Sequence, residues 1–352
     1  MFITGIGTAL PPHRYTQPQC WEALQSWGGF EKLAPRSRAI LKKVLTGDSG
    51  LDGRHLAFNH LAEGFIWTPD VMQARFVEHA PALAAQAGER ALQTSGIAPS
   101  SIDAVLVSTC TGYLCPGLTS YVVERLGLNH DVLALDLVGQ GCGAAIPNLR
   151  AGESLVRSGH CQHALSICVE VCSAAVYIDD DPGVLISACL FGDGAGAAVV
   201  SRERSANSRA IRFRDAGTLL DPGSRELLRF EQKGGLLRNV LTPLVPTLAA
   251  RHAAEVFREV TRRADVVRKD IAQWIFHAGG REVLAALRDE FNLHARELEH
   301  STEVLRQVGN ISSPFVLHVL ARALEHGAPG GAWWMGSFGA GFASHGILLD
   351  VE

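Results

Sequence analysis

The sequence predicts an α/β fold built from two related halves. Short apolar runs rich in Val, Leu and Ala alternate along the chain with amphipathic stretches of helical spacing. Runs that are apolar on both faces are typical of strands buried in a sheet that helices cover on both sides. A weak internal repeat, in which a strand, a turn and a helix recur in the same order, predicts the duplication.

The elements follow in order from the N-terminus. MFITGIGTALPP carries no basic residue before Arg14, so we interpret it as a buried strand that enters a turn and not as a signal peptide. Further strands are expected at 104–109, 132–138, 164–170, 195–200 and 345–351. Helices are expected over 80–95 and over 247–268, where Arg and Glu would line the solvent face.

The repeat aligns residues 141–159 with residues 309–327. Each range begins with a glycine and a polar or reactive side chain, continues as a helical stretch and ends on a glycine. Each also carries a proline near the first turn of its helix, Pro147 or Pro314, where a helix tolerates proline. We therefore expect an N-terminal half at 1–202 and a C-terminal half at 203–352.

The stretch that joins the halves, 201–214, reads SRERSANSRAIRFR. Its five Arg and three Ser favour a solvated linker over a phosphate-binding patch.

Composition and spacing exclude several classes of function. The 32 basic and 36 acidic residues give a net charge of −4, so no general nucleic-acid footprint is expected. Eight Cys form no C-x-x-C pair and no zinc-spaced cluster, which indicates reduced thiols in a cytoplasmic protein without a metal site. The sequence contains no run of about 20 predominantly apolar residues, so we expect no membrane span. The glycines at 139–143 do not form a dinucleotide-binding fingerprint.

Cys142 is the first candidate for chemistry. It lies in DLVGQGCGAAIPNL, between a predicted strand and a predicted helix, with a glycine on each side. A thiol at a helix N-terminus is near unpaired N–H groups and the positive end of the helix dipole. Both lower the pKa of the thiol and favour the nucleophilic thiolate, although most intracellular cysteines are structural.

Two further residues could act with this thiol. His277 ends an apolar run in WIFHAGG, at the edge of a sheet where α/β sites assemble, and could accept the proton of Cys142. Asn310 occupies in the second half the place of Cys142 in the first, so the duplication would bring the two helix N-termini together. Its amide could then donate a hydrogen bond to a developing oxyanion. Taken alone, each has an ordinary structural interpretation.

With these three residues the sequence resembles the type III polyketide synthases, the chalcone and stilbene synthase-like enzymes of the thiolase superfamily, and most resembles bacterial members. The motifs that carry the resemblance come in family order and span nearly the whole chain: GQGCGAA, HAGG, GNISS, LFGDGAGAAVV and SFGAG. The resemblance implies a duplicated α/β/α/β/α thiolase fold and a homodimer. It implies an acyl-CoA starter and malonyl-CoA as substrates, with no metal or redox cofactor.

The resemblance also implies roles for the three residues. Cys142 would carry the starter acyl group, and His277 would keep its thiol ionised. His277 and Asn310 would hold the thioester oxygen while malonyl-CoA loses carbon dioxide, and the enolate would attack the acyl-enzyme. Iterative extension and cyclisation or release would follow.

Substrate-binding residues come from the same resemblance. The gatekeeping Phe would be Phe191, with a second near Gly234, where this chain has no aromatic residue. The other implied substrate-binding residues are Ser312, Cys115, Cys172, Gly339 and Gly341. Cys115 stands in place of a Met that plant members place at the cavity wall across the dimer, and Cys172 in place of a small hydroxyl residue. Arg38, Lys42 and Lys43 are expected at the coenzyme A entrance, although a solvated helix face fits them equally well.

Two alternatives stay open at the level of sequence. One is a ketoacyl carrier-protein synthase of the third type, which shares the Cys, His and Asn but condenses once on a carrier-protein thioester. Those enzymes usually carry His-Gln-Ala-Asn where this chain has HAGG. The other is a non-catalytic partner subunit, which the presence of all three chemical residues disfavours.

Overall fold

The computed structural model describes residues 1–205 and 209–352. Its large sheet contains β1 (Phe2–Ala9), β4 (Ala104–Ser108), β5 (Leu133–Leu137), β6 (His163–Glu170), β7 (Gly194–Ser201), β8 (Ile211–Leu220), β11 (Ile271–Phe276), β12 (Gly331–Gly339) and β13 (Ala343–Val351). Two short pairs lie outside it, β2 (Arg14–Thr16) with β3 (Gly53–His55), and β9 (Leu228–Lys233) with β10 (Leu236–Leu241).

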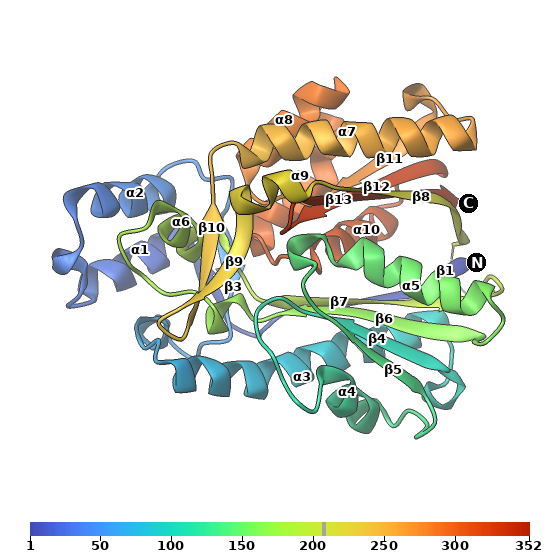
Figure 1. Cartoon of the computed structure of the whole chain (residues 1–352), viewed down its shortest axis with the longest axis horizontal. Helices are drawn as coiled ribbons and strands as arrows, with labels where there is room; N and C mark the ends of the chain where they lie inside the picture. Colours follow the sequence, from blue (N-terminus) through green and yellow to red (C-terminus); the bar gives the residue numbers. More distant parts are fainter. Residues whose placement is uncertain (206–208) are drawn as a thin grey trace.

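The helices are α1 (Gln17–Ser26), α2 (Pro35–Thr46), α3 (Pro69–Ser95), α4 (Leu118–Leu126), α5 (Ala145–Arg157), α6 (Pro182–Leu190), α7 (Val245–Ala264), α8 (Arg281–Phe291), α9 (Glu299–Val308) and α10 (Phe315–Glu325). Figure 1 shows five layers in the order helix, sheet, helix, sheet, helix. Helices α5 and α10 lie in the central layer and pack on strands of both halves. The predicted α/β/α/β/α fold is confirmed.

The strand order is β11-β12-β13-β8-β1-β7-β6-β4-β5. The halves meet where β1 pairs antiparallel with β8, through Phe2 with Arg212 and Ile3 with Ile211. This junction is short, and further contact between the halves comes from α5 and α10, from the turn that holds Cys142 against β12 and β13, and from α6 against β10. Each layer pair buries its own apolar core, as expected for strands covered on both faces.

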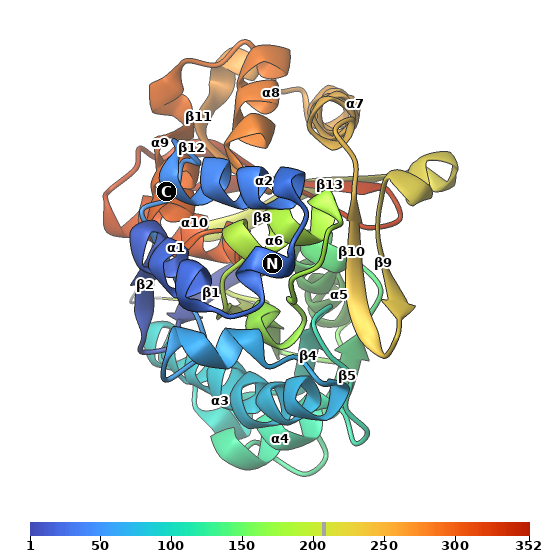
Figure 2. The same ribbon diagram turned by 90° about the vertical axis from the view of Figure 1, so that its left-hand side faces the viewer.

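A third, smaller core lies at one end of the molecule. Helices α1, α2 and α6 gather there on one side of the chain, as Figure 2 shows. Their apolar faces meet through Leu24, Leu41, Leu45 and Leu185, all of which are buried. This helical cap closes the end of the molecule at which α6 leads into Phe191.

The predicted strands all form within a residue or two of the expected bounds, but three predictions need correction. The helix expected at 80–95 begins at Pro69, where Thr68 caps it by accepting a hydrogen bond from the Val71 N–H, and it runs through Pro81. The helix expected at 247–268 ends at Ala264. The residue that follows has a left-handed φ of 51°, which closes the last turn.

The polar stretch 201–214 is not a linker throughout. Residues 211–214 open β8, where Arg212 and Arg214 form ion pairs with Asp350 of β13. Residues 206–208 of that stretch lie outside the described residues. Alternating charged side chains hid the strand because its partners across the sheet are far away in the sequence. The division of the chain at 202/203 stays a prediction.

Among the helices of residues 1–205 and 209–352, none has both the length and the apolar character needed to cross a bilayer.

Asn148 of α5 joins the central helix to the sheet below it. Its amide donates hydrogen bonds to the Ser108 hydroxyl (2.7 Å) and the Ile167 carbonyl (3.0 Å), and its oxygen accepts one from the Ser166 hydroxyl (2.7 Å). Asn148→Ala would leave these buried groups unpaired, so we expect it to lower the free energy of unfolding by about 2–4 kcal/mol.

Urea unfolding followed by circular dichroism would measure this loss. The matched control is Asn129→Ala, which removes an exposed amide with a single bond to a backbone carbonyl. A loss at Asn148 no larger than the loss at Asn129 would contradict the proposed anchoring.

Candidate active site

Cys142 lies in a 3-10 turn, Gly141–Gly143, between β5 and α5. Gly141 has φ 55°, and a Cβ there would come within 2.9 Å of the backbone nitrogen of Ala340. The turn is therefore pressed against the connection between β12 and β13, and glycine is needed for both reasons. The predicted strand–turn–helix setting of the thiol is confirmed, with the thiol one turn before α5 rather than inside it.

The second glycine of the turn meets Gly339 at the end of β12. A Cβ on Gly339 would lie 2.3 Å from the Gln140 carbonyl oxygen and 2.5 Å from the Gly143 backbone nitrogen, so no side chain fits. The Ser337 hydroxyl donates to the Gly143 carbonyl at 3.0 Å. The SFGAG segment thus holds the backbone of the turn that carries Cys142. Gly339 is needed there because it lets the two backbones approach closely.

His277 follows the last residue of β11, and its N–H donates to the Gly336 carbonyl of β12 at 2.9 Å. Its ring packs edge-on against Phe338 and Phe315, with ring centroids 5.2 and 5.4 Å apart. Both ring nitrogens are buried and have no hydrogen-bond partner among the described residues. The apolar surroundings leave the imidazole free to exchange a proton with a group in the site.

Asn310 pairs through its backbone with the segment around Phe191, in an isolated parallel bridge. Its N–H donates to the Leu190 carbonyl (2.9 Å), and its carbonyl accepts from the Gly192 N–H (3.0 Å). The side-chain oxygen accepts from the Ser312 N–H at 2.9 Å, and Nδ2 donates to the Gly279 carbonyl at 3.2 Å. The second Nδ2 hydrogen has no acceptor in the described part of the chain.

A continuous set of contacts brings the three predicted residues together. The Ser312 hydroxyl lies 3.1 Å from the sulfur of Cys142, and Ser312 is bonded to Asn310 as described. Asn310 in turn reaches the carbonyl two residues after His277. On the other side, Phe338 contacts the ring of His277 and continues into Gly339, against the nucleophile's turn. Ser312, predicted as a cavity-wall residue, touches the reactive sulfur directly.

Burial dominates the electrostatics of the pair. Desolvation raises the pKa of Cys142 to about 12, although the hydrogen bond from Ser312 opposes this shift. Desolvation alone lowers the pKa of His277 to about 3. A proton moved from the sulfur to the imidazole would create opposite charges, and their attraction would offset part of both desolvation costs. The helix N-terminus therefore does not by itself ionise the thiol, contrary to the expectation from sequence.

Glu170, at the end of β6, is a site residue that sequence reasoning missed. Its carboxyl is fully buried and accepts hydrogen bonds from the hydroxyls of Ser313 (2.6 Å) and Thr111 (2.9 Å) and from the Cys110 N–H (3.0 Å). Burial raises its pKa, and its charge further raises the pKa of Cys142. The available signal was a single acidic residue closing the apolar run ALSICVE.

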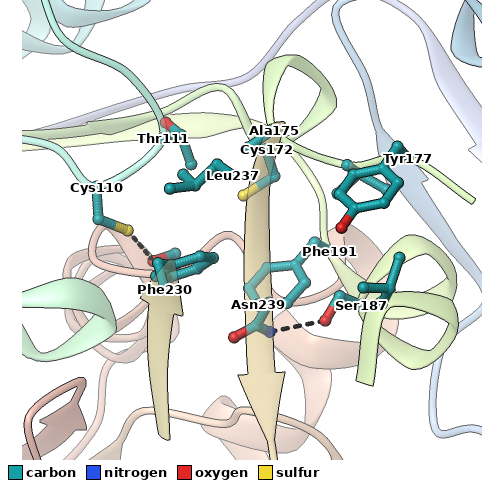
Figure 3. Close-up of a pocket in the computed structure, with 13 residues that line it drawn as sticks. Cys110, Thr111, Cys172, Ala175, Tyr177, Ser187, Phe191, Phe230, Leu237 and Asn239 are labelled. Atoms are coloured by element: carbon teal, nitrogen blue, oxygen red, sulfur yellow. Dashed lines mark hydrogen bonds between the residues drawn. The ribbon is translucent and has the colours of Figure 1, made fainter. Parts of the chain in front are cut away.

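A cavity adjoins Ser312 (Figure 3), and we refer to it as the reaction cavity. Its walls are Cys110, Thr111, Cys172, Ala175, Val176, Tyr177, Val184, Ser187, Phe191, Phe230, Leu237, Asn239 and Ser312. Phe191 and Cys172 thus line the cavity that the resemblance assigned to them. Because the walls are largely apolar with a few polar groups, the cavity suits a small acyl chain.

The second gate position was misplaced. Gly234 lies at the tip of the β9–β10 hairpin with φ 60° and open space around it, so no side chain there would reach the cavity. The hairpin instead presents Phe230 and Asn239 to the cavity, as Figure 3 shows. The Asn239 amide donates to the Ser187 hydroxyl at 2.7 Å. An alignment of motifs could not find these residues because the hairpin's register sets which side chains point inward.

The other predicted substrate-binding residues lie outside the reaction cavity. Cys115 is exposed on the loop after β4, which leaves it available to a neighbouring chain. Gly341, with φ 103°, lines a larger open cavity on the outer side of the β9–β10 hairpin.

The entrance residues all lie on α2. Arg38 forms an ion pair with Glu31, whereas Lys42 and Lys43 are exposed and have no ion pair among the described residues. None of the three lines the reaction cavity.

In residues 1–205 and 209–352, no group of three or more His, Cys, Asp or Glu side chains is arranged to hold a metal ion.

His277→Gln tests the coupling between the imidazole and the thiol. Without the proton acceptor, burial alone governs Cys142 and holds its pKa high, so thiolate forms only at strongly alkaline pH. We expect iodoacetamide to modify Cys142 of the unchanged protein at lower pH than in the variant. Rates measured by mass spectrometry from pH 5 to 10 would show this, and coincident pH profiles would rule out the coupling.

Two family models match the chain. Residues 29–216 match "FAE1/Type III polyketide synthase-like protein", and residues 222–350 match "Chalcone and stilbene synthases, C-terminal domain". Together they cover nearly the whole chain, and the boundary between them falls at the end of β8. They give no support to the ketoacyl carrier-protein synthase alternative.

Individual relatives agree with the family models. The chain is 30% identical to the 1,3,6,8-tetrahydroxynaphthalene synthase of Streptomyces peucetius, over 99% of this chain and 92% of that enzyme. It is 27% identical to the 3,5-dihydroxyphenylacetyl-CoA synthase of Streptomyces toyocaensis, over 92% and 83%. Its structure matches that of PKS-I from the brown alga Ectocarpus siliculosus with a TM-score of 0.89 and 26% identity, over 99% and 98%. The chain belongs to the type III polyketide synthase family.

Proposed function

We propose that this chain condenses malonyl-CoA iteratively onto an acyl-CoA starter bound to Cys142, with cyclisation or release of the product. The observation that carries the proposal is the unbroken contact from the Cys142 sulfur through Ser312 to the Asn310 amide and the end of β11, where His277 lies. A nucleophile, a proton acceptor and a free amide N–H are the groups that an acyl condensation needs, and Ser312 connects them to the apolar cavity whose wall it forms.

The first step loads the starter. His277 accepts the thiol proton of Cys142, and the thiolate attacks the carbonyl carbon of the acyl-CoA thioester. The tetrahedral intermediate collapses with loss of coenzyme A thiolate, which takes up a proton, and leaves the acyl group on the sulfur. The buried surroundings of His277 make the imidazolium costly, so it readily returns its proton.

The second step forms the carbon–carbon bond. Loss of carbon dioxide from malonyl-CoA leaves an electron pair delocalised onto the thioester oxygen. The second Nδ2 hydrogen of Asn310 and a ring N–H of His277 would donate to that oxygen. One such donor lowers the activation barrier by about 3 kcal/mol. The enolate carbon attacks the acyl-enzyme carbonyl, the Cys142 sulfur leaves, and the extended chain on coenzyme A can reload the thiol.

Coenzyme A would approach along α2. Lys42 and Lys43 are exposed and unpaired among the described residues, so their charges are available for its phosphates. Arg38 is already paired with Glu31 and would contribute less.

A homodimer is part of the proposal, and the edge of the sheet supports it. Strand β5 ends the strand order and leaves Leu133 43% exposed, with Val138 61% and Tyr113 70% exposed beside it. Natural proteins seldom leave an apolar sheet edge uncovered. A second copy on this edge would bring the exposed Cys115 loop against its partner.

All eight cysteines are free, which supports a cytoplasmic location.

Cys142→Ala should abolish polyketide product because the variant lacks the thiol that carries the acyl chain in this proposal. Purified protein would be incubated with malonyl-CoA and a panel of acyl-CoA starters, and products identified by mass spectrometry. Cys161→Ala, which removes a buried thiol outside the site, is the matched control. Asn310→Ala should slow malonyl-CoA decarboxylation about 10²- to 10³-fold. Undiminished product from Cys142→Ala would refute the assignment of Cys142 as the acyl carrier, whereas no product from the unchanged protein would favour a non-catalytic subunit.

Leu133→Lys should dissociate the dimer, since the substitution places a charge in an apolar contact. Sedimentation equilibrium of the unchanged protein should give twice the 37.7 kDa mass of the chain, and the variant should approach one mass. Leu220→Lys, at another exposed leucine far from β5 in the strand order, should leave the mass unchanged. A monomeric unchanged protein would overturn this part of the proposal.

A further inference from the structure

The β9–β10 hairpin separates the reaction cavity from a second space. Phe230, Leu237 and Asn239 of the hairpin line the reaction cavity. Phe230 and Leu237 also line the open cavity on the outer side of the hairpin, which we refer to as the outer cavity. At these residues a single layer of the protein lies between the reaction cavity and the outer cavity.

This hairpin receives no support from a larger sheet. In the described chain, β9 and β10 pair only with each other, and Figure 2 shows them apart at one side of the molecule. A two-stranded hairpin is only marginally stable in water, so its position depends on neighbouring elements. One such neighbour of β10 is α6, which supplies Val184 and Ser187 to the same cavity wall. The seam between β10 and α6 is therefore part of that wall.

Two polar contacts hold this seam closed. On the cavity face, the Asn239 amide donates to the Ser187 hydroxyl at 2.7 Å, as Figure 3 shows. On the other face, the Arg238 guanidinium donates to the Asp181 carboxylate through Nη2 and to the Glu231 carboxylate through Nη1 (3.0 Å). Successive side chains of a strand point to opposite faces, so Arg238 can hold the seam without entering the reaction cavity.

Asp181 is itself fixed to the start of α6. Its carboxylate caps the helix by accepting hydrogen bonds from the N–H groups of Gly183 (2.9 Å) and Val184 (3.3 Å). Burial opposes ionisation of this carboxyl, but the hydrogen bonds from Arg238 and from the helix outweigh it and lower the pKa of Asp181. Because the side chains of Arg238 and Asp181 are only 24% and 27% exposed, water screens their attraction less than that of a fully exposed pair.

An acyl group on Cys142 is lost if water reaches it before the malonyl-derived enolate does. We propose that Arg238 is a positioning residue that holds the β9–β10 hairpin against α6, excludes water from the acyl-enzyme and so determines how many extensions precede release. The inference rests on the proposed function. In the competing reaction the oxygen of water bonds to the acyl carbonyl carbon, the bond from that carbon to the Cys142 sulfur breaks, and a proton of the water passes to the sulfur. The products are a free carboxylic acid and the thiol.

The lifetime of the acyl-enzyme measures this water entry directly. Butanoyl-CoA without malonyl-CoA would load Cys142, and intact-protein mass spectrometry would follow the loss of the adduct after gel filtration. Arg238→Met removes the charge at similar side-chain length. We expect it to shorten the half-life of the adduct about tenfold, because a hydrogen bond between charged groups shifts an equilibrium by about that factor. With malonyl-CoA present, the same variant should release more free acid and less of the longest product.

Three further variants distinguish positioning from general damage. Arg229→Met is the matched control, because it removes a guanidinium of the same hairpin whose partners, Glu226 and Glu231, do not lie on α6. It should change the half-life less than about twofold. Asp181→Ser keeps a side chain that caps helices but loses the ion pair, so it should match Arg238→Met, and combining the two should add little. Arg238→Lys, which offers a point charge instead of a fork, should restore part of the half-life.

Hydrogen exchange tests the same contact without catalysis. Backbone amides of residues 236–241 should exchange about tenfold faster in Arg238→Met than in Arg229→Met, while those of α5 stay unchanged. Thermal unfolding checks that each variant folds. Equal adduct half-lives in Arg238→Met and Arg229→Met, or equal exchange of the hairpin, would overturn the role of Arg238. Failure of the proposed function would instead appear as the absence of any adduct on Cys142 of the unchanged protein.

Discussion

The approach of two backbones, at Gly339 and at the Gly143 end of the nucleophile's turn, is the contact on which the active site depends. One belongs to the last strands of the chain and the other to the turn after β5, so the contact fixes the C-terminal half against the N-terminal half. A single added carbon at Gly339 would lie 2.3 Å from a carbonyl oxygen. Phe338, the residue before it, packs on His277, and so the same strand positions both the backbone next to Cys142 and the ring of His277.

Loss of water around these groups then determines their chemistry. Desolvation drives both the imidazole of His277 and the thiol of Cys142 toward the neutral form. Glu170 lies in the same dry region, where hydroxyl and amide donors surround its carboxyl. Its charge opposes the thiolate while Ser312 favours it, so the nucleophile lies between two opposing influences set by neighbouring side chains.

Much of this structure could be predicted from local patterns in the sequence. Buried strands of apolar residues and the glycines around Cys142 leave signals within about ten residues, and the repeat pairs that turn with Asn310. Residues whose role depends on partners far away in the sequence leave weaker signals. Strand β8 reads as a polar linker because Asp350 neutralises its arginines from the far end of the chain. Phe230 and Asn239 reach the cavity through the register of a hairpin, which motif spacing does not encode. The raised pKa of the thiol reflects desolvation and the charge of Glu170, which a local argument from a helix end does not include.

The backbone of Phe191 is held from two directions, by the bridge to Asn310 and by the Arg54 guanidinium. A residue fixed in this way can gate only by turning its ring about its side-chain torsions. Rotation of that ring requires no loop or domain closure, motions that take microseconds to milliseconds and often limit turnover. Movement of the Phe191 ring would therefore add no slow conformational step to catalytic cycles repeated on one thiol.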